Sequence, residues 1–240
     1  MKILVVSDNY PSLENPARGT FVYNLIQQFC SLGHEVTVIS PQNFLSKGAK
    51  KVESYGEENC MVYRPTSYSF SNRNILGYNT YLLSEISAVQ SVKKVVALQN
   101  LEFDVVYCHF LWNAIIAQRA LGKFKKSIFA AIGEYDELNV RRNYYSSSKY
   151  KKYIDTISGF IAVSPQIQER LIEHGADKRK IIVEPNAVDL ELFYPRNKEE
   201  MRIKYGLPLD KKLVIFVGRF HEDKGPLRVC LLYTSDAADE

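Results

Sequence analysis

The chain opens on an apolar run that leads directly into polar residues. Residues 2–6 (KILVV) form this run, and a short stretch rich in β-branched residues is typical of a parallel strand buried on both faces. Residues 20–35 then place apolar side chains three and four positions apart, which predicts an amphipathic helix with Thr20 as its N-cap and Gly33 at its end. Residues 35–40 (EVTVIS) predict a second strand, so the chain begins with a βαβ unit.

The same alternation of strand and helix patterns continues to about residue 185. Pro165 and Gly175 frame one of the helices, because proline fits the first helical turn and glycine fits the position after the last turn. Such alternation predicts a doubly wound parallel α/β sheet. The further strand and helix candidates lie at residues 60–65, 82–99, 103–110, 113–123, 126–133, 152–164 and 165–175.

A domain boundary is expected near Pro185, so that residues 1–185 form the first domain. Residues 180–195 have the pattern of a short strand that runs into an irregular connector, and a helical turn or more is expected within 197–208. Residues 212–220 (KLVIFVGRF) are strongly apolar and predict a strand of a second unit. Fewer residues follow Pro185 than the roughly 100 of a self-sufficient α/β domain. Residues 186–229 are therefore expected to be a linker and the start of an incomplete second domain.

Composition limits the class of protein but does not identify a function. Of the 240 residues, 46% are apolar and 24% are charged, as in ordinary soluble globular proteins. The formal net charge of +4 is too small to require nucleic acid as a partner, although it suits an anionic ligand. The four cysteines are scattered without metal-like spacing, so neither a structural metal nor a disulfide framework is expected. No run of about 18 apolar residues is present, which predicts a cytoplasmic, non-spanning protein.

Glycines at two predicted loops suggest anion binding. The first strand-to-helix turn lacks GxGxxG, which counts against a nicotinamide or flavin enzyme, but Gly19 precedes a helix whose amides suit a phosphate or carboxylate. An ordinary turn glycine is the alternative. After the strand predicted at 212–220, Gly218 admits close approach, and Arg219 and Lys224 can converge on a diphosphate. The alternative there is a solvated basic loop.

His109 is the histidine best placed for a binding role. It ends the strand predicted at 103–110, at the edge where open α/β sheets gather ligands. A histidine satisfied by neighbouring backbone is an equal alternative. The other three histidines, His34, His174 and His221, are interpreted as surface turn residues.

Taken in order, these segments resemble the GT-B glycosyltransferases of the large retaining family four. The resemblance implies two facing Rossmann-like domains, with an acceptor held mainly by the first and a nucleotide sugar mainly by the second. The donor is then a substrate, and no cofactor or metal is expected. The resemblance extends over about residues 1–229 and rests on residues 1–11, 19–40, 104–110, 160–175, 181–195 and 213–225.

The resemblance also assigns roles to residues. Gly19 matches the glycine loop near the donor phosphates, and Arg219 with Lys224 matches a basic pair that neutralises the departing nucleoside diphosphate. His109 matches a histidine that often lines the acceptor pocket. Ser164 falls at a strand end near the interdomain cleft, although capping of the helix that begins at Pro165 is the favoured interpretation.

One departure from the family pattern affects the reacting sugar. Many relatives carry His-Gly-x-Asp after the strand that corresponds to residues 126–133, whereas residues 131–138 here read AIGEYDEL. Glu134 or Asp136 could replace that histidine in contacts to sugar hydroxyls. Both could equally cap the following helix.

The end of the sequence departs from the family as well. The late glutamate pair spaced Glu-x7-Glu is absent, and residues 230–240 (CLLYTSDAADE) resemble an in-frame translation of a sequencing-library adapter. We therefore expect residues 230–240 to be non-native, the helix after Gly225 to break into a polar tail, and this chain by itself to show little or no transferase activity. The apolar stretch within 212–220 is expected to promote aggregation.

Three functions remain open on the sequence. The leading one is transfer of a sugar from a nucleotide-diphosphate sugar to a saccharide or lipid-linked saccharide in cell-envelope or exopolysaccharide assembly. The alternatives are a nucleotide-sugar epimerase of the same fold and a non-catalytic acceptor-binding domain. If the acceptor is membrane-bound, residues 122–127 (GKFKKS) could touch anionic lipid at the inner face of the membrane, the alternative being a solvated loop.

Overall fold

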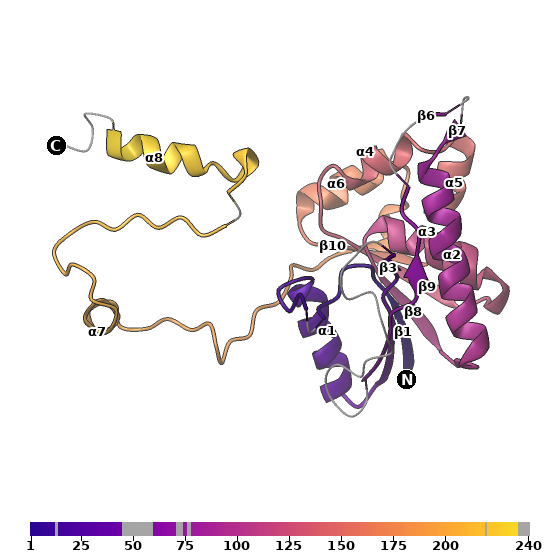
Figure 1. Cartoon of the computed structure of the whole chain (residues 1–240), viewed down its shortest axis with the longest axis horizontal. Coiled ribbons are helices and arrows are strands. Elements are labelled where there is room, and N and C mark those ends of the chain that lie inside the picture. The colour runs from indigo at the N-terminus through magenta and orange to yellow at the C-terminus, as the bar shows by residue number, and fades with distance from the viewer. Residues whose placement is uncertain (13, 45–59, 71–73, 76–77, 219, 235–240) are drawn as a thin grey trace. The chain divides into compact units, whose positions relative to one another are not determined.

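The computed structural model describes residues 1–12, 14–44, 60–70, 74–75, 78–218 and 220–234 (Figure 1). The chain divides into two compact units, Met1–Ala187 and Val188–Glu240. The first unit contains the sheet and the large hydrophobic clusters, whereas the described elements of the second are helical.

The centre of the first unit is a parallel sheet of seven strands within the described residues. Each strand is short and apolar, and inner strands are covered on both faces, as the sequence predicted. The chain adds strands first to one side of β1 and then to the other, which makes the sheet doubly wound. From one edge to the other the strands are β4 (Cys60–Tyr63), β2 (Glu35–Ile39), β1 (Lys2–Val6), β8 (Val105–His109), β9 (Ser127–Ile132), β10 (Gly159–Ala162) and β11 (Ile181–Val183).

Two pairs of short strands accompany the main sheet. The strand β3 (Gln42–Asn43) pairs in parallel with β5 (Thr66–Ser67), beyond the carboxyl ends of β2 and β4. The strand β6 (Asn74–Ile75) pairs antiparallel with β7 (Tyr78–Asn79).

Helices cover the sheet on both faces. On one face α1 (Thr20–Ser31) packs Val22, Ile26 and Cys30 against β1 and β2. The opposite face packs against the larger group of helices. This group consists of α2 (Tyr81–Leu98), α3 (Leu111–Leu121), α5 (Ser147–Thr156) and α6 (Pro165–Glu173), and the short α4 (Glu137–Arg142) lies between α3 and α5 in the chain.

The predicted helix ends are mostly confirmed. Gly33 and Gly175 each follow the last residues of a helix with positive φ, and the next amide bonds back into the final turn, as in a Schellman motif. Ser164 caps α6, because its Oγ accepts the Ile167 amide N–H at 3.3 Å. The predicted N-cap Thr20 is wrong: Thr20 is already helical, and Gly19 occupies the cap position in the left-handed region.

In the second unit the strand predicted within residues 212–220 does not form. Residues 212–217 carry no strand, and Ile215 and Val217 are 72% and 89% exposed. A strand needs a neighbour to accept its backbone hydrogen bonds, and the described part of this unit contains no other strand. An apolar sequence was therefore not sufficient to form a strand.

The remaining described elements of the second unit are α7 (Lys198–Lys204), a 3-10 turn at Glu222–Lys224 and α8 (Pro226–Thr234). The helix after Gly225 continues to Thr234, and the polar tail predicted to follow it lies outside the described residues. Its first residue is Pro226, which is well suited to a first helical turn, and Leu227 and Leu231 lie four residues apart, as on one face of a helix. Among the described helices none combines the length and apolarity needed to cross a membrane.

Candidate functional site

The candidate site lies at the carboxyl ends of β1 and β8. These strands are neighbours, and the direction of strand addition reverses between them. In open α/β sheets such a reversal leaves a crevice in which ligands bind. Asp8 follows β1 and His109 ends β8, so polar side chains from distant parts of the sequence meet at this edge.

His109 is held as a neutral imidazole. It is 3% exposed, with the ring of Phe21 at 4.8 Å and that of Phe110 at 4.6 Å between centroids. Burial lowers the pKa of His109 to about 4. Its Nδ1 lies 3.1 Å from the Tyr107 hydroxyl, which keeps its proton because burial raises the pKa of Tyr107. A neutral imidazole here can exchange hydrogen bonds with a hydroxyl but cannot supply a positive charge near neutral pH.

The turn after His109 has an unusual backbone. Phe110 has φ 73° and ψ 149°, a region that favours glycine, and it precedes α3 without a side-chain cap. Its amide donates to the Ala131 carbonyl at 2.8 Å, and Asn113 Nδ2 donates to the His109 carbonyl at 2.6 Å. These two bonds fix the turn on both sides of the strained residue.

Asn113 also fastens the turn after β1. Its Nδ2 donates to Asp8 Oδ1 at 2.8 Å, and its Oδ1 accepts the Asp8 amide N–H at 3.3 Å. Asn113 is fully buried, so its amide serves these partners rather than solvent. One side chain therefore joins the ends of β1 and β8.

Glu137 stabilises the first turn of α3 from the other side. It is 6% exposed, and its Oε1 accepts the Trp112 amide N–H at 3.3 Å. Its Oε2 has no hydrogen-bond partner among the described residues. Burial raises the pKa of Glu137 to about 8, while the charge of Arg141 opposes that shift. Near neutral pH this carboxyl is mainly protonated.

Position 19 requires a glycine. It has φ 66°, and a Cβ atom there would lie 2.2 Å from the Asn9 carbonyl oxygen. The loop after β1 therefore packs directly on the start of α1. The amides of Thr20 and Phe21 come before the first helical hydrogen bond, which the Val22 N–H donates to the Gly19 carbonyl at 3.0 Å. The donor-phosphate role of Gly19 stays a prediction.

The residues predicted to contact acceptor or sugar are differently placed. Glu134 and Asp136 are exposed, between β9 and α4. Asp136 occupies the cap position of α4, but its side chain makes no capping bond. Ser164 has the capping role described above, in agreement with the favoured interpretation. Contacts from these three residues to a ligand stay predictions.

The predicted diphosphate pair belongs to the second unit. Lys224 is exposed and ends the 3-10 turn Glu222–Lys224, while Arg219 lies outside the described residues. Their convergence with Gly19 on one ligand stays a prediction.

His174 is wrongly predicted as a surface turn residue. It is 8% exposed and lies between two helices of the first unit, with Nδ1 3.0 Å from the Tyr150 hydroxyl and Nε2 3.1 Å from Asn139 Oδ1. Since an amide oxygen can only accept, Nε2 carries the proton and Nδ1 accepts from Tyr150. Burial lowers the pKa of His174, as do Arg170 and Arg142 nearby. The imidazole is therefore a structural link between α4, α5 and the end of α6.

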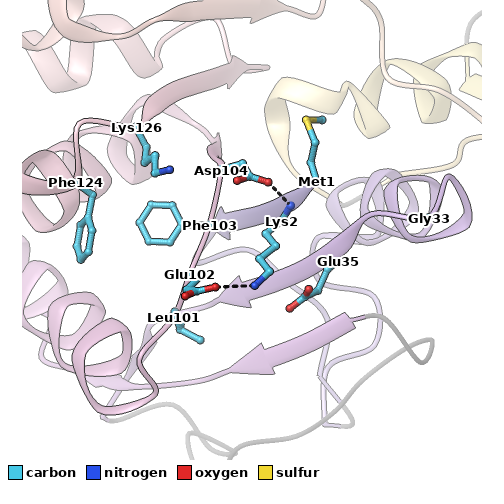
Figure 2. A pocket seen from close by; sticks show the side chains of 10 residues that line it. All are labelled: Met1, Lys2, Gly33, Glu35, Leu101, Glu102, Phe103, Asp104, Phe124 and Lys126. Atoms are coloured by element: carbon cyan, nitrogen blue, oxygen red, sulfur yellow. Dashed lines mark hydrogen bonds and ion pairs between the residues drawn. The ribbon is translucent and has the colours of Figure 1, made fainter.

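The larger of two described hollows lies at the wrong edge of the sheet for this chemistry. Its volume is about 640 Å³, and Figure 2 shows it at the amino ends of the strands. Lys2 crosses it, with Nζ 2.8 Å from Glu102 Oε2 and its amide nitrogen 2.8 Å from Asp104 Oδ2. The other hollow, of about 170 Å³, includes Asp8 and Trp112 and therefore adjoins the candidate site.

Sequence reasoning missed Asp8, Asn113 and Glu137. Asp8 had a readable signal, because it is a polar residue directly after a buried strand at the ligand edge. Asn113 and Glu137 had none, since their partners are 105 and 25 residues away in the chain.

Comparison with known proteins agrees with this fold. Residues 19–192 match the family model of Glycosyltransferase Family 4, and the chain belongs to this family. It is 26% identical to the provisionally named teichuronic acid biosynthesis glycosyltransferase TuaC of Bacillus subtilis, covering 94% of this chain and 60% of that protein. It is 24% identical to a D-inositol 3-phosphate glycosyltransferase of Corynebacterium aurimucosum, covering 94% of this chain and 56% of the relative. The chain thus spans less than two thirds of these relatives.

Solved structures show the same architecture. Sucrose-phosphate synthase from Thermosynechococcus elongatus superposes with a TM-score of 0.66 at 15% identity, covering 94% of this chain and 57% of that one. Anabaena HepE, solved in complex with UDP-glucose, superposes with a TM-score of 0.51 at 16% identity, covering 86% of this chain and 50% of that one. At these identities the likeness establishes the GT-B type of Rossmann-like fold, which confirms the predicted fold class.

Proposed function

We propose that this chain is part of a glycosyltransferase that moves a sugar from a nucleotide-diphosphate sugar to a saccharide or lipid-linked saccharide, with retention of configuration at the transferred carbon. The match of residues 19–192 to Glycosyltransferase Family 4 carries this proposal. The site geometry is compatible with it, since a neutral His109 and a fixed Asp8 suit hydroxyl groups. None of the described features favours the epimerase alternative.

In the proposed reaction the bond between the sugar's anomeric carbon and the diphosphate oxygen breaks. The electron pair leaves with the nucleoside diphosphate, and an acceptor hydroxyl forms the new bond on the same face while its proton passes to the departing phosphate. Negative charge grows on the leaving group, so cations and amides fixed near it lower the barrier. We assign that role to the amides after Gly19 and to Arg219 and Lys224, with no metal or cofactor required.

The proposed acceptor side is the first unit, and membrane contact through residues 122–127 receives little support. These residues run from the carboxyl end of α3 to the first residue of β9, so they lie at the amino edge of the sheet. The candidate site lies at the carboxyl edge. Lipid contact there would face away from the site, so the arrangement supports the solvated-loop alternative.

The test is an assay with a panel of nucleotide sugars and saccharide acceptors, with products identified by mass spectrometry and their anomeric configuration by NMR. It uses both the 240-residue chain and the chain extended along the reading frame past Val229. We expect transfer with retention from the extended chain and little or none from the shorter one. His109→Gln in the extended chain should lower kcat/KM by about tenfold or more, as expected for a lost hydrogen bond in the site. Glu102→Gln at the amino edge is the matched control.

Two results would overturn the proposal. One is an extended chain that consumes no nucleotide sugar. The other is interconversion of the nucleotide sugar without an acceptor product, which would favour the epimerase.

A further inference from the structure

The first turn of α3 needs a cap that the residue before it cannot provide. Phe110 occupies the cap position, and its side chain has no oxygen to accept the amide N–H groups that follow. Leu111 and Asn113 are fully buried, so water is a poor substitute for a cap at this end of the helix. The amides of the first turn therefore depend on acceptors from elsewhere in the fold.

Phe110 packs against His109 instead of capping the helix. Its ring centroid lies 4.6 Å from that of the imidazole and 6.3 Å from that of Phe21. The backbone of Phe110, at φ 73° and ψ 149°, is in a region that disfavours every residue except glycine. Such a residue keeps its conformation only while its surroundings hold it. If φ returned to negative values, the turn would change shape and the imidazole would move with it.

Glu137 provides the acceptor from α4. Its Oε1 accepts the Trp112 N–H at 3.3 Å, and a hydrogen bond from the Leu111 backbone also acts on the carboxyl. Glu137 therefore holds the helical side of Phe110. On the strand side, the Phe110 amide donates to the Ala131 carbonyl at 2.8 Å. The strained residue is fixed between these two contacts.

The carboxyl of Glu137 is mainly protonated near neutral pH. Burial raises its pKa to about 8, the charge of Arg141 and the two amides oppose that shift, and the charge of Glu134 adds to it. Tyr150 on α5 also lies within reach of this charge. A glutamine at position 137 keeps the acceptor oxygen without a charge and thus imitates the protonated carboxyl. A leucine has a similar volume but offers the amides no acceptor.

We propose that Glu137 is a positioning residue for His109: by accepting the first amides of α3, it keeps the Phe110 turn and the buried imidazole in the orientation that meets a substrate hydroxyl. The inference rests on the proposed function, in which His109 contacts such a hydroxyl. It goes further by assigning the orientation of the imidazole to a residue that acts through the backbone of α3.

The first experiment follows the imidazole of His109 by NMR in the 240-residue chain, without substrate. The pKa of His109 is about 4 while the turn is closed. Glu137→Leu should release the turn, admit water to the imidazole and raise this pKa to about 5.5 or higher. Glu137→Gln should leave it near 4. An unchanged His109 pKa in Glu137→Leu would overturn the proposal, and so would an equal rise in both variants.

Ser146→Ala is the matched control. Ser146 caps α5, a different helix of the same unit, by accepting the Lys149 amide N–H at 3.4 Å. Its removal also costs the unit a helix cap, but it should leave the pKa of His109 near 4. A rise as large as that in Glu137→Leu would mean that any loss of stability exposes the imidazole, which would overturn the specific role of Glu137.

A second measurement decides the matter if Glu137→Leu does not fold. In the natural chain the imidazole resonances of His109 should shift as Glu137 ionises near pH 8, because the charge alters the contact with the α3 amides. In Glu137→Gln that shift should be absent. The same behaviour of both proteins between pH 7 and pH 9 would overturn the proposal.

The extended chain provides the functional test. Glu137→Leu should lower kcat by about tenfold or more, because the imidazole is displaced from the reacting hydroxyl. The KM for the nucleotide sugar should stay within about twofold of its natural value. Glu137→Gln should keep the natural kcat at pH 7, and so should Ser146→Ala.

The outcomes separate this inference from the proposed function. If the extended chain transfers no sugar but the His109 pKa rises in Glu137→Leu alone, the transferase is refuted and the control of the imidazole by Glu137 stands. If Glu137→Leu transfers sugar with the natural kcat, the positioning role is refuted and the transferase stands.

Discussion

Two apolar runs of nearly the same composition end up in opposite environments. Residues 2–6 (KILVV) form β1, in which Leu4, Val5 and Val6 have no exposed surface. Residues 212–217 (KLVIFV) form no strand, and four of their apolar side chains are 38% to 89% exposed. β1 pairs with β2 and β8 and is covered by helices on both faces, whereas the second run has no strand to pair with among the described residues of its unit. An apolar run can therefore be buried only where neighbouring strands and helices are present to cover it.

The largest difference between the two runs should appear on truncation of one side chain. Leu4→Ala removes a fully buried side chain from an inner strand and should lower the free energy of unfolding by about 4 kcal/mol. Ile215→Ala, at a side chain that is 72% exposed, should change it by no more than about 0.5 kcal/mol. Urea denaturation followed by Trp112 fluorescence measures the first change, and denaturation followed by far-UV circular dichroism, which sees both units, measures the second. A comparable loss from Ile215→Ala would mean that the second run is buried after all.

Acid should destabilise the first unit through His109. The pKa of this histidine is about 4 in the folded protein and near 6.5 when unfolded, so the unfolded state binds the proton more readily. Its contribution to stability is complete above pH 6.5 and is lost as the pH falls toward 4, by about 3 kcal/mol in total. Denaturation curves across this range should show the loss, and His109→Gln should reduce the slope. An unchanged slope in that variant would assign the acid sensitivity to other groups.

Two glycines with nearly equal φ angles sharpen the comparison further. Gly19 has φ 66° with the Asn9 carbonyl against it, and Gly206 after α7 has φ 64° with open space around it. Gly19→Ala adds a steric clash to left-handed strain and should cost about 3 kcal/mol of global stability. Gly206→Ala adds left-handed strain without a clash. It should therefore lower the free energy of local opening of α7 by about 1 kcal/mol. Denaturation measures the effect of Gly19→Ala, and amide hydrogen exchange measures the effect of Gly206→Ala. Equal losses of free energy in the two variants would contradict the tight packing at Gly19.

The smallest effects are expected at helix caps. Ser164 caps α6 in the first unit, and Asn197 caps α7 in the second by accepting the amide N–H groups of Glu199 and Glu200. Each change to alanine should cost about 1 kcal/mol. Ser164→Ala should lower the unfolding midpoint of the first unit, whereas Asn197→Ala should only increase hydrogen exchange within α7. A shift of the first unit's midpoint by Asn197→Ala would show that the two units unfold together.

The fold of the first unit could be predicted because its local signals agree with its tertiary contacts. The runs at β1, β2 and β8 are apolar, and each found a parallel neighbour of the same kind. Gly33 and Gly175 ended their helices because their sequence positions require positive φ. The prediction of a strand within 212–220 failed because the apolar pattern of a segment does not show whether a partner strand is present.

The site was less predictable than the fold. His109 could be proposed from its place at the end of a buried strand, and it lies at the carboxyl edge of the sheet as predicted. The neutral state of its imidazole, however, depends on burial by Phe21 and Phe110. The position of Asp8 depends on the side-chain amide of Asn113, which lies 105 residues further on. His174 was misjudged for the same reason, because Tyr150 and Asn139 reach it from other helices. Charge state and orientation arise from contacts between elements, which periodicity does not record.

The parallel pairing of β1 with β8 has a consequence for synthesis on the ribosome. The Lys2 amide bonds to Asp104, which lies 102 residues later in the chain. At the roughly 5 to 20 residues per second of translation, this interval lasts about 5 to 20 seconds. During that time β1 can pair with β2, and β2 with β4, but the other edge of β1 stays open to any available strand. An inner strand of the finished sheet is therefore an exposed edge in the nascent chain, and the arrival of β8 at the ribosome exit closes it.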